Sequence, residues 1–373
     1  MRARARVGVN ACIVGGDPTG LGIYTVKLIC ALDRIRDDFV VYSSCPEAFG
    51  PLRARIERAP VAVRPDFGVR GHLVRLFWLQ SALRFRVRRA GLRMLLNTMP
   101  EGIAGLPIPQ ATVVHDLLPL RFPAEYPRQQ YYFRYFVPRI LHASRVVIAD
   151  SEFTRRDVVN HYGVSLAKAR VIYPGYDPVM FLHDGVGPSP DPSEDPHFLY
   201  VGNLLPHKNV LRLLDALAIV RSRRPCRLII RGAGRPAYVR ALRERVETLG
   251  LGDAVTFLGY IDERGLRNLY SRAACLVLPS LGEGFGLPVL EAMACGTPVI
   301  AASTASLPEV AGDAALMVDP HDAINLADAM YRVLTDSGLQ KDLRWRGLER
   351  VRSFSWRRSA EAMSRLLDDS LAQ

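Results

Sequence analysis

Two glutamates, Glu283 and Glu291, lie eight residues apart in a segment suited to binding a phosphate and the sugars attached to it. They follow an apolar run typical of a buried strand, and the pattern predicts a short helix over Leu287–Ala294. Amides at a helix N-terminus carry partial positive charge and bind anions. Gly284 and Gly286 have no Cβ, so the backbone can approach such a ligand closely. A phosphate flanked by two sugars, with the carboxylates on sugar hydroxyls, describes a nucleotide sugar.

A glycine-rich loop before a helix is often only a turn, so the surrounding sequence has to decide between the two interpretations. The run EGFGLPVLEAMACGTPVIAASTASLPEVAGDAALMVDP, residues 283–320, resembles the donor-binding signature of the retaining glycosyltransferases of family 4. That family has the GT-B fold. The resemblance therefore implies an α/β protein with two doubly wound parallel-sheet, Rossmann-like domains facing across a cleft, and it implies a hexosyltransferase.

The same resemblance assigns roles within this segment. It implies that Glu283 contacts the hydroxyls of the donor sugar as a catalytic residue and that Glu291 contacts the ribose hydroxyls. The donor site would also include Gly284, Phe285, Gly286 and Leu287, the last three through backbone amides.

A second segment, YVGNLLPHKN at 200–209, resembles the family's diphosphate loop. The resemblance places Gly202 in the donor site and Lys208 on the diphosphate as a catalytic cation. Asn203 and His207 stand where some or many family members carry arginine, and a neutral histidine contributes less to a dianion than a guanidinium does. Either Arg231, at the end of the next predicted strand, compensates, or the affinity for diphosphate is lower and depends on pH.

Polar residues also follow two predicted strands of the first half. Gly20 and Gly22 resemble the family's glycine loop, which lines the cleft near the donor phosphate and the acceptor, and Tyr24 follows on the acceptor side. His115 resembles the family's histidine near the donor sugar, which implies a hydrogen bond to the sugar as its catalytic role. Asp116 either orients this loop or contacts the acceptor.

The chain contains no Asp-x-Asp sequence, so the usual divalent-metal signature is absent. We therefore expect no metal cofactor. The leaving diphosphate would be stabilised by Lys208, by other cations and by helix N-terminal amides. The resemblance further implies retention at the anomeric carbon, with the leaving phosphate taking the acceptor's proton. It places Tyr260 at the nucleotide base, with contacts largely through the backbone.

Length and composition agree with a soluble two-domain enzyme. A chain of 373 residues, with 49% apolar and 23% charged residues, is long enough for two full cores. No apolar run is long enough to span a membrane, and the basic N-terminus leads into a short predicted strand, so no signal peptide is expected. The six cysteines show no C-x-x-C pair or zinc-ligand spacing, which favours buried free thiols in a reducing cytoplasm.

A net charge of +12 favours acidic partners, and much of the basic charge is concentrated in one stretch. No acid occurs between residues 67 and 100, whereas arginines alternate with apolar residues over 70–93. Part of this spacing fits an amphipathic helix on an anionic membrane surface, at the inner face of the plasma membrane. A solvated helix packed on its own domain is the alternative. No nucleic-acid-binding module accompanies the stretch, so nucleic acid is not expected as a partner.

Strands and helices alternate in both halves, which predicts parallel sheets with helices on both faces. The predicted strands are Val7–Ile13, Phe39–Tyr42, Met94–Asn97, Thr112–His115 and Arg145–Ala149 in the first half, and Phe198–Val201, Leu228–Arg231, Ala254–Leu258, Cys275–Pro279, Pro298–Ala301 and Ala315–Val318 in the second. The predicted helices are Leu21–Leu32 and Phe153–His161 in the first half, and 208–222, 236–249, 262–272 and 322–335 in the second. The proline-rich segment 176–196 has the composition of a linker. It would separate an acceptor-side domain, 1–175, from a nucleotide-sugar domain, 197–352. A helix over 353–373 would cross back to the first domain.

These predictions favour transfer of a hexose from a nucleotide sugar to a lipid-linked or saccharide acceptor during synthesis of a cell-surface polysaccharide. The 195–320 region resembles mannosyltransferases, so GDP-mannose is the expected donor, with UDP- and dTDP-sugars as alternatives. A non-catalytic protein that binds nucleotide sugars or glycans is a further alternative, because His207 departs from the family pattern. A dinucleotide-dependent oxidoreductase is disfavoured, since residues 15–22 lack the G-x-G-x-x-G spacing.

Overall fold

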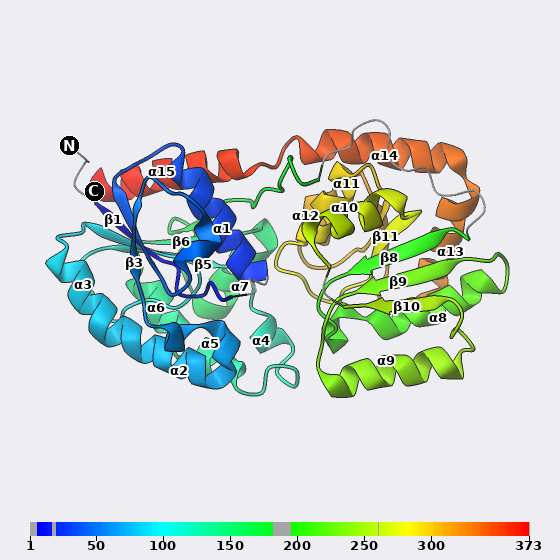
Figure 1. Ribbon diagram of the computed structural model, residues 1–373, viewed down its shortest axis with the longest axis horizontal. Coiled ribbons are helices and arrows are strands. Elements are labelled where there is room, and N and C mark those ends of the chain that lie inside the picture. The colour runs from blue at the N-terminus through cyan, green and yellow to red at the C-terminus, as the bar shows by residue number, and fades with distance from the viewer. Residues whose placement is uncertain (1–5, 17–19, 182–194, 260, 373) are drawn as a thin grey trace. The chain divides into compact units, whose positions relative to one another are not determined.

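The computed structural model describes residues 6–16, 20–181, 195–259 and 261–372. The chain forms two compact units: Met1–Gly175 with Trp356–Gln373, and Tyr176–Ser355 (Figure 1). Of the linker predicted over 176–196, residues 176–181 belong to the second unit, and 182–194 lie outside the described residues. The C-terminal helix α15 (Trp356–Ala372) belongs to the first unit.

A seven-stranded parallel sheet forms the centre of the first unit, in the order β3-β2-β1-β4-β5-β6-β7. Its strands are β1 (Val7–Asn10), β2 (Phe39–Ser43), β3 (Arg55–Arg58), β4 (Met94–Asn97), β5 (Gln110–Val114), β6 (Val146–Ala149) and β7 (Ala169–Val171). The strand order reverses between β1 and β4, so the carboxyl ends of these strands mark the topological switch point, where open α/β sheets bind ligands.

Helices cover both faces of this sheet because successive strand residues point to opposite sides. Val7 and Val9 of β1 pack in one core with α1 (Gly20–Asp33) and α15. Val40 and Tyr42 of β2 pack in a second core with α2 (Gly68–Trp78), a π-helical turn (Leu79–Leu83) and α3 (Arg84–Arg89). The remaining helices of this unit are α4 (Leu118–Arg121), α5 (Gln129–Tyr135), α6 (Val137–Ala143) and α7 (Glu152–Tyr162).

Helix α15 is held on the first unit by its buried apolar residues and by Arg36. These residues are Trp356, Ala360, Met363, Leu367 and Leu371, which recur at helical spacing and are buried beside α1. Arg36 donates to the Ser364 hydroxyl at 3.2 Å and to Asp38 at 2.7 Å, so the guanidinium joins the end of α1 to α15.

The second unit has a six-stranded parallel sheet in the order β10-β9-β8-β11-β12-β13, with its switch point between β8 and β11 (Figure 1). Its strands are β8 (His197–Val201), β9 (Arg227–Arg231), β10 (Val255–Leu258), β11 (Cys275–Leu278), β12 (Val299–Ala302) and β13 (Leu316–Val318). Its helices are α8 (Val210–Arg221), α9 (Pro236–Thr248), α10 (Glu263–Arg272), α11 (Leu287–Ala294), α12 (Leu307–Ala311), α13 (Ala323–Thr335) and α14 (Ser337–Val351). Helix α13 packs on α8, and α14 packs on α11.

The two doubly wound parallel sheets predicted from the sequence are confirmed, and several elements were missed. Strand β3 has the sequence RIER and lies at the sheet edge, where burial does not impose apolar residues. Strand β7 has only three residues. The segments α4–α6 and α14 were not predicted. All six cysteines are free thiols, and all but Cys30 are buried. Among the described residues, no helix combines the length and apolar character needed to cross a bilayer.

Candidate active site

Two loops leave the carboxyl edge of the second sheet side by side. The Gly202 amide donates to the Arg231 carbonyl at 3.1 Å, and the Leu204 amide donates to the Ala233 carbonyl at 2.8 Å. A Cβ at Gly232 would lie 1.8 Å from the Gly202 carbonyl oxygen, so this position requires glycine. The predicted diphosphate loop after β8 is thereby fixed to the loop that follows Arg231 at the end of β9.

The structure brings together two residues that the sequence placed in separate motifs. Lys208, in the turn after β8, and Glu283, in the loop after β11, form an ion pair with 2.7 Å between Nζ and Oε1. Their side chains are 13% and 14% exposed, so the pair is largely shielded from water. The Ser280 hydroxyl donates to the same carboxylate oxygen at 2.9 Å. An ammonium suited to a phosphate therefore lies beside a carboxylate suited to sugar hydroxyls.

A short polar framework holds the Lys208 turn against the loop after β11. Asn209 adopts a left-handed conformation (φ 59°), and its side-chain Nδ2 donates to the carbonyls of Pro279 at 3.0 Å and Pro320 at 2.7 Å. The Leu281 amide donates to the His207 carbonyl at 2.7 Å. The His207 side chain, predicted to contact the diphosphate, is only 1% exposed, and its backbone carbonyl belongs to this framework.

Gly286 directs the start of helix α11. Its φ of 101° is strained for residues with a Cβ, and a Cβ there would lie 2.8 Å from Cδ2 of Leu307. The Ser306 hydroxyl lies 3.0 Å from the carbonyls of both Glu283 and Phe285, which fixes the loop from the side of β12. The Phe285 ring is buried 5.9 Å from that of Phe354, so only its backbone can serve the predicted site.

The amides that α11 offers to an anion are few. Pro288 lacks an N–H group, and the Val289 amide donates to the Gly286 carbonyl at 3.0 Å. Gly286 and Leu287, two of the residues predicted for the donor site, therefore carry the first amides at the positive end of this helix.

Glu291 is held by a buried tyrosine. The Tyr270 hydroxyl, on α10, donates to Oε2 of Glu291 at 2.7 Å. Burial and the Glu291 charge raise the pKa of Tyr270 well above its ordinary value, so the phenol stays protonated and remains a donor. Arg231 interacts electrostatically with this tyrosine. Within the described part of the chain, the Arg231 Nε–H group is buried and has no hydrogen-bond partner.

The other predicted donor residues are less constrained. Asn203 is exposed, and its carbonyl accepts the Tyr200 hydroxyl at 2.9 Å. Gly202 and Gly284 lie in the loops already described, after β8 and β11. Tyr260 lies outside the described residues.

In the first unit, His115 lies at the end of β5 with both ring nitrogens engaged. Nε2 donates to the Thr98 carbonyl at 2.8 Å, and Nδ1 lies 2.5 Å from Oδ2 of Asp150. Burial alone would lower the pKa of His115, but the Asp150 carboxylate outweighs it, and the pKa is raised. Both partners are acceptors, so this geometry suits an imidazolium that donates from both nitrogens, and the ring is 9% exposed. The predicted sugar hydrogen bond would require one of these contacts to be given up.

Asp116 and Tyr24, which lie beside His115, make contacts within the first unit. Oδ1 of Asp116 accepts the Leu118 amide at 3.0 Å, a contact within its own loop. The Tyr24 ring lies between His115 and Trp356, at centroid distances of 4.6 and 5.5 Å. Tyr24 is 3% exposed, so its predicted acceptor contact would need the ring to move.

The predicted glycines of the first unit lie at the start of α1. Gly20 is exposed, with no atom within 4 Å of a built Cβ, and Gly22 is buried. Residues 17–19, which precede them, lie outside the described residues.

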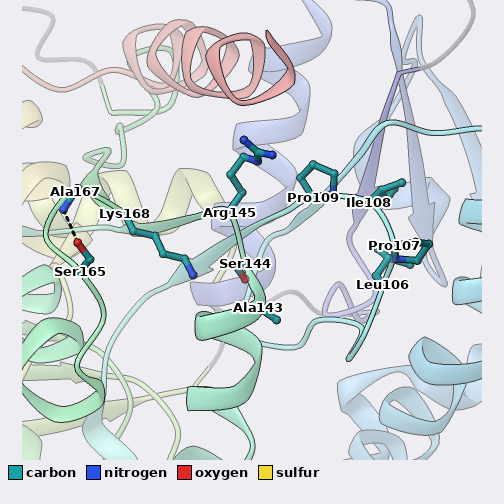
Figure 2. A pocket seen from close by; sticks show the side chains of 10 residues that line it. All are labelled: Leu106, Pro107, Ile108, Pro109, Ala143, Ser144, Arg145, Ser165, Ala167 and Lys168. Carbon is teal, nitrogen blue, oxygen red and sulfur yellow. Dashed lines mark hydrogen bonds between the residues drawn. The ribbon is translucent and has the colours of Figure 1, made fainter. Parts of the chain in front are cut away.

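An open pocket of about 640 Å³ lies at the opposite edge of the first sheet (Figure 2). Its lining comes from segments that precede β5, β6 and β7: Leu106, Pro107, Ile108, Pro109, Ala143, Ser144, Arg145, Ser165, Ala167 and Lys168. The Lys168 ammonium donates to the His142 carbonyl at 2.6 Å. No predicted site residue lines this pocket, because all of them follow the carboxyl ends of strands.

Sequence reasoning missed the residues that hold the site together. Ser280, Asn209, Tyr270 and Ser306 act through contacts between different loops, which spacing alone does not reveal. Asp150 was missed for the same reason, although its position directly after a buried strand could have marked it. Among the described residues, no cluster of three or more His, Cys, Asp or Glu side chains is arranged to hold a metal ion.

Two doubly wound parallel sheets in one chain form the architecture of the GT-B glycosyltransferases. Models of protein families agree with this class along most of the chain. Residues 18–179 match Glycosyltransferase Family 4, and residues 187–350 match Glycosyl transferases group 1. The chain belongs to the family 4 glycosyltransferases, and it is an enzyme of that type.

Similar proteins include some that are named as O-antigen chain mannosyltransferases. The chain is 29% identical over 335 residues to the O-antigen chain mannosyltransferase RfbU of Salmonella typhimurium, which covers 87% of this chain and 90% of that protein. It is 39% identical over 162 residues to O-antigen chain mannosyltransferase B of Escherichia coli, or 42% of each chain. A D-inositol 3-phosphate glycosyltransferase of Kribbella flavida is 30% identical over 237 residues, 60% of this chain and 56% of that one.

Solved structures share the fold along the whole chain. Sucrose-phosphate synthase of Thermosynechococcus elongatus superposes with a TM-score of 0.79 at 24% identity, covering 99% of this chain and 100% of that one. WaaG, a glycosyltransferase involved in lipopolysaccharide biosynthesis, superposes with a TM-score of 0.72 at 16% identity, covering 96% and 99%. At these identities the likeness establishes the fold alone.

Proposed function

We propose that this protein is a retaining, metal-independent mannosyltransferase that moves mannose from GDP-mannose to a lipid-linked or saccharide acceptor in surface-polysaccharide assembly. The observation that carries the proposal is the pairing of Lys208 with Glu283 at the switch point of the second sheet. The named mannosyltransferase activities of two similar proteins support the choice of sugar.

In this proposal Lys208 and the amides of Gly286 and Leu287 bind the diphosphate. When the donor enters, the ammonium turns from Glu283 to phosphate oxygens, and the released carboxylate accepts hydrogen bonds from the sugar hydroxyls. The ammonium thereby exchanges one anion for another, and the carboxylate exchanges the ammonium for hydroxyl donors, so neither is left buried and unpaired. Glu291, oriented by Tyr270, accepts from the ribose hydroxyls.

Catalysis then depends on charge stabilisation and positioning. The bond between the anomeric carbon and the phosphate oxygen breaks, and Lys208 and the helix amides stabilise the negative charge that develops on the diphosphate. An acceptor hydroxyl attacks the same face of the sugar and passes its proton to the leaving phosphate oxygen, which gives retention. No step requires a side chain as nucleophile.

Arg231 is proposed to supply the positive charge that Asn203 and His207 do not. It ends β9 at the carboxyl edge of the sheet, and its buried Nε–H is unpaired among the described residues, so an incoming phosphate or ribose oxygen would satisfy it. The buried His207 is assigned a structural role in this account, so Lys208 and Arg231 carry the positive charge toward the diphosphate.

The test is a transfer assay with purified protein, GDP-mannose and a polyprenyl-diphosphate-linked saccharide, followed by NMR of the product. Transfer that persists in EDTA, with an α-configured mannose in the product, is the expected result. Transfer from UDP- or dTDP-sugars alone would reject the donor, and a β-linked product would reject retention. Nucleotide binding without turnover of any donor would favour the non-catalytic alternative.

A further inference from the structure

The long helix formed by α2, the π-helical turn and α3 exposes an apolar stripe. Val69 is 48%, Leu73 60%, Phe77 74% and Phe85 64% exposed. Single exposed apolar residues are normal on a soluble protein, but four large ones along one helix are not explained by chance exposure. We call these four residues the apolar stripe.

The π-helical turn keeps the stripe on one side of the helix. At about 100° per residue, each step of four residues drifts by about 40°, so Phe85 would lie about 160° away from Val69 on a regular α-helix. The extra residue of a π turn removes about 100° of this drift and returns Phe85 to within about 60° of Val69. The Ser81 hydroxyl donates to the Phe77 carbonyl at 2.7 Å within this turn.

The opposite side of the same helix is fixed to its own unit. Trp78, Leu79, Leu83 and Val87 are buried in the core against β2 and β4. Arg75, 4% exposed, forms two hydrogen bonds to the buried carboxylate of Glu101. Packing on the unit therefore accounts for this side only, and the apolar stripe cannot turn inward without breaking a buried ion pair.

Positive charge surrounds the apolar stripe. Arg70, Arg88 and Arg89 are exposed, and within the described residues none of them forms an ion pair. Arg84 and Arg86 donate to backbone carbonyls, those of Ala104 and Arg58 among them. Arg86 also lies 4.0 Å from a carboxylate oxygen of Glu57. The charge on this helix that has no acidic partner in the described part of the chain therefore includes that of Arg70, Arg88 and Arg89.

The neighbouring helix α5 adds further exposed rings. Its Tyr132 packs at 5.1 Å from His72 of α2, which places the two helices in contact. On α5 and directly after it, Tyr131, Tyr135 and Phe136 are 57%, 53% and 53% exposed. Aromatic residues of this kind favour the interface between lipid headgroups and acyl chains.

We propose that the apolar stripe inserts into the surface of an anionic lipid bilayer, with Arg70, Arg88 and Arg89 on the lipid headgroups. Apolar side chains projecting from a basic helix are the chemistry of an interfacial anchor, in which area and charge both contribute. The inference deepens the proposed function, since a lipid-linked acceptor lies in such a surface, but its test does not require transfer.

The experiment is co-sedimentation of the full chain with phosphatidylcholine vesicles that either contain or lack phosphatidylglycerol. The wild-type protein should pellet with the anionic vesicles only and should be released by high salt, because salt screens the arginine contacts. The triple variant Leu73→Ser/Phe77→Ser/Phe85→Ser and the triple variant Arg70→Gln/Arg88→Gln/Arg89→Gln should each weaken binding by about tenfold or more.

Matched controls remove exposed apolar residues elsewhere. Leu166→Ser in the first unit and Trp345→Ser on α14 change side chains that are 58% and 64% exposed, and binding should remain as in the wild type. Thermal stabilisation by nucleotide, measured on every variant, reports that the protein is folded and that the donor site is intact. It also separates failure of this inference from failure of the proposed function.

Wild-type binding to neutral vesicles as strong as to anionic ones would overturn the inference. So would the absence of vesicle binding, or triple variants that bind as the wild type does.

Discussion

Replacing Lys208 with methionine should destabilise the second unit even without any ligand. The variant removes the ammonium that lies 2.7 Å from the Glu283 carboxylate. The carboxylate is 14% exposed and keeps only its hydrogen bond from the Ser280 hydroxyl among these two contacts. Breaking a fully buried pair costs about 3–5 kcal/mol, and an exposed pair contributes about 0–1 kcal/mol. For a pair this shielded we expect a loss of about 2–3 kcal/mol in the free energy of unfolding.

Replacing the other partner of the pair, Glu283, should destabilise the protein less. In Glu283→Gln the lysine remains, but its flexible stem can carry the ammonium into water. The double variant Lys208→Met/Glu283→Gln should regain part of the loss, because no charge is then buried alone. A double-mutant cycle should thus give a coupling energy of about 1–2 kcal/mol.

The assay is urea unfolding of the wild type, both single variants and the double variant, followed by tryptophan fluorescence. As a matched control, Asp328→Asn removes a half-exposed pair with Arg223 in the same unit and should change stability by about 0–1 kcal/mol. The same four proteins titrated with GDP should show affinity weakened by about 10- to 100-fold in Lys208→Met. Single variants whose effects simply add, or Lys208→Met that unfolds as the wild type does, would refute the ion pair.

Three further changes test other parts of the site. Glu283→Ala should lower transfer by about 100-fold or more while the protein stays folded, and turnover at the wild-type rate would remove its assigned role. Gly286→Ala should cost about 1–3 kcal/mol and weaken nucleotide binding, because its φ is 101° and Leu307 lies 2.8 Å from the new Cβ. Gly250→Ala, with φ of 66° but open space, is its matched control and should bind nucleotide normally. Asp150→Asn should lower the thermal midpoint most between about pH 5 and 6.5, since the raised pKa of His115 contributes stability that is complete below the ordinary histidine pKa and is lost as pH rises through the folded value. An effect that grows toward pH 9 would contradict the His115–Asp150 ion pair.

The fold was predictable where burial dictates the sequence. Strands such as β6 and β11 are apolar on both faces, and a polar residue follows each within two positions, so their position and parallel pairing could be inferred. Strand β3 carries two arginines and a glutamate at the sheet edge and gives no such signal. The π-helical turn over Leu79–Leu83 was also beyond prediction, because it depends on how the helix is fixed at both ends by buried contacts.

The sequence predicts those site residues that directly follow the carboxyl ends of strands. Lys208 and Glu283 follow neighbouring strands at the switch point, which is why motifs 75 residues apart converge. The contacts of His207 and His115 were not predictable, since each depends on loops that only the tertiary structure brings close. The sequence suggested ligand-facing polar groups, whereas the structure places one in a buried framework and the other in an ion pair with Asp150.

The measurement that tests the central claim most directly is a thermal-shift panel with GDP, UDP, dTDP and ADP, each with and without EDTA. A nucleotide at about 100 times its dissociation constant adds about 2.7 kcal/mol of stability, which is readily detected. The account predicts a shift that is largest with GDP, unchanged by EDTA, and strongly reduced in Lys208→Met. A shift that EDTA removes, or no shift with any of the four nucleotides, would contradict a metal-independent donor site built around Lys208 and Glu283.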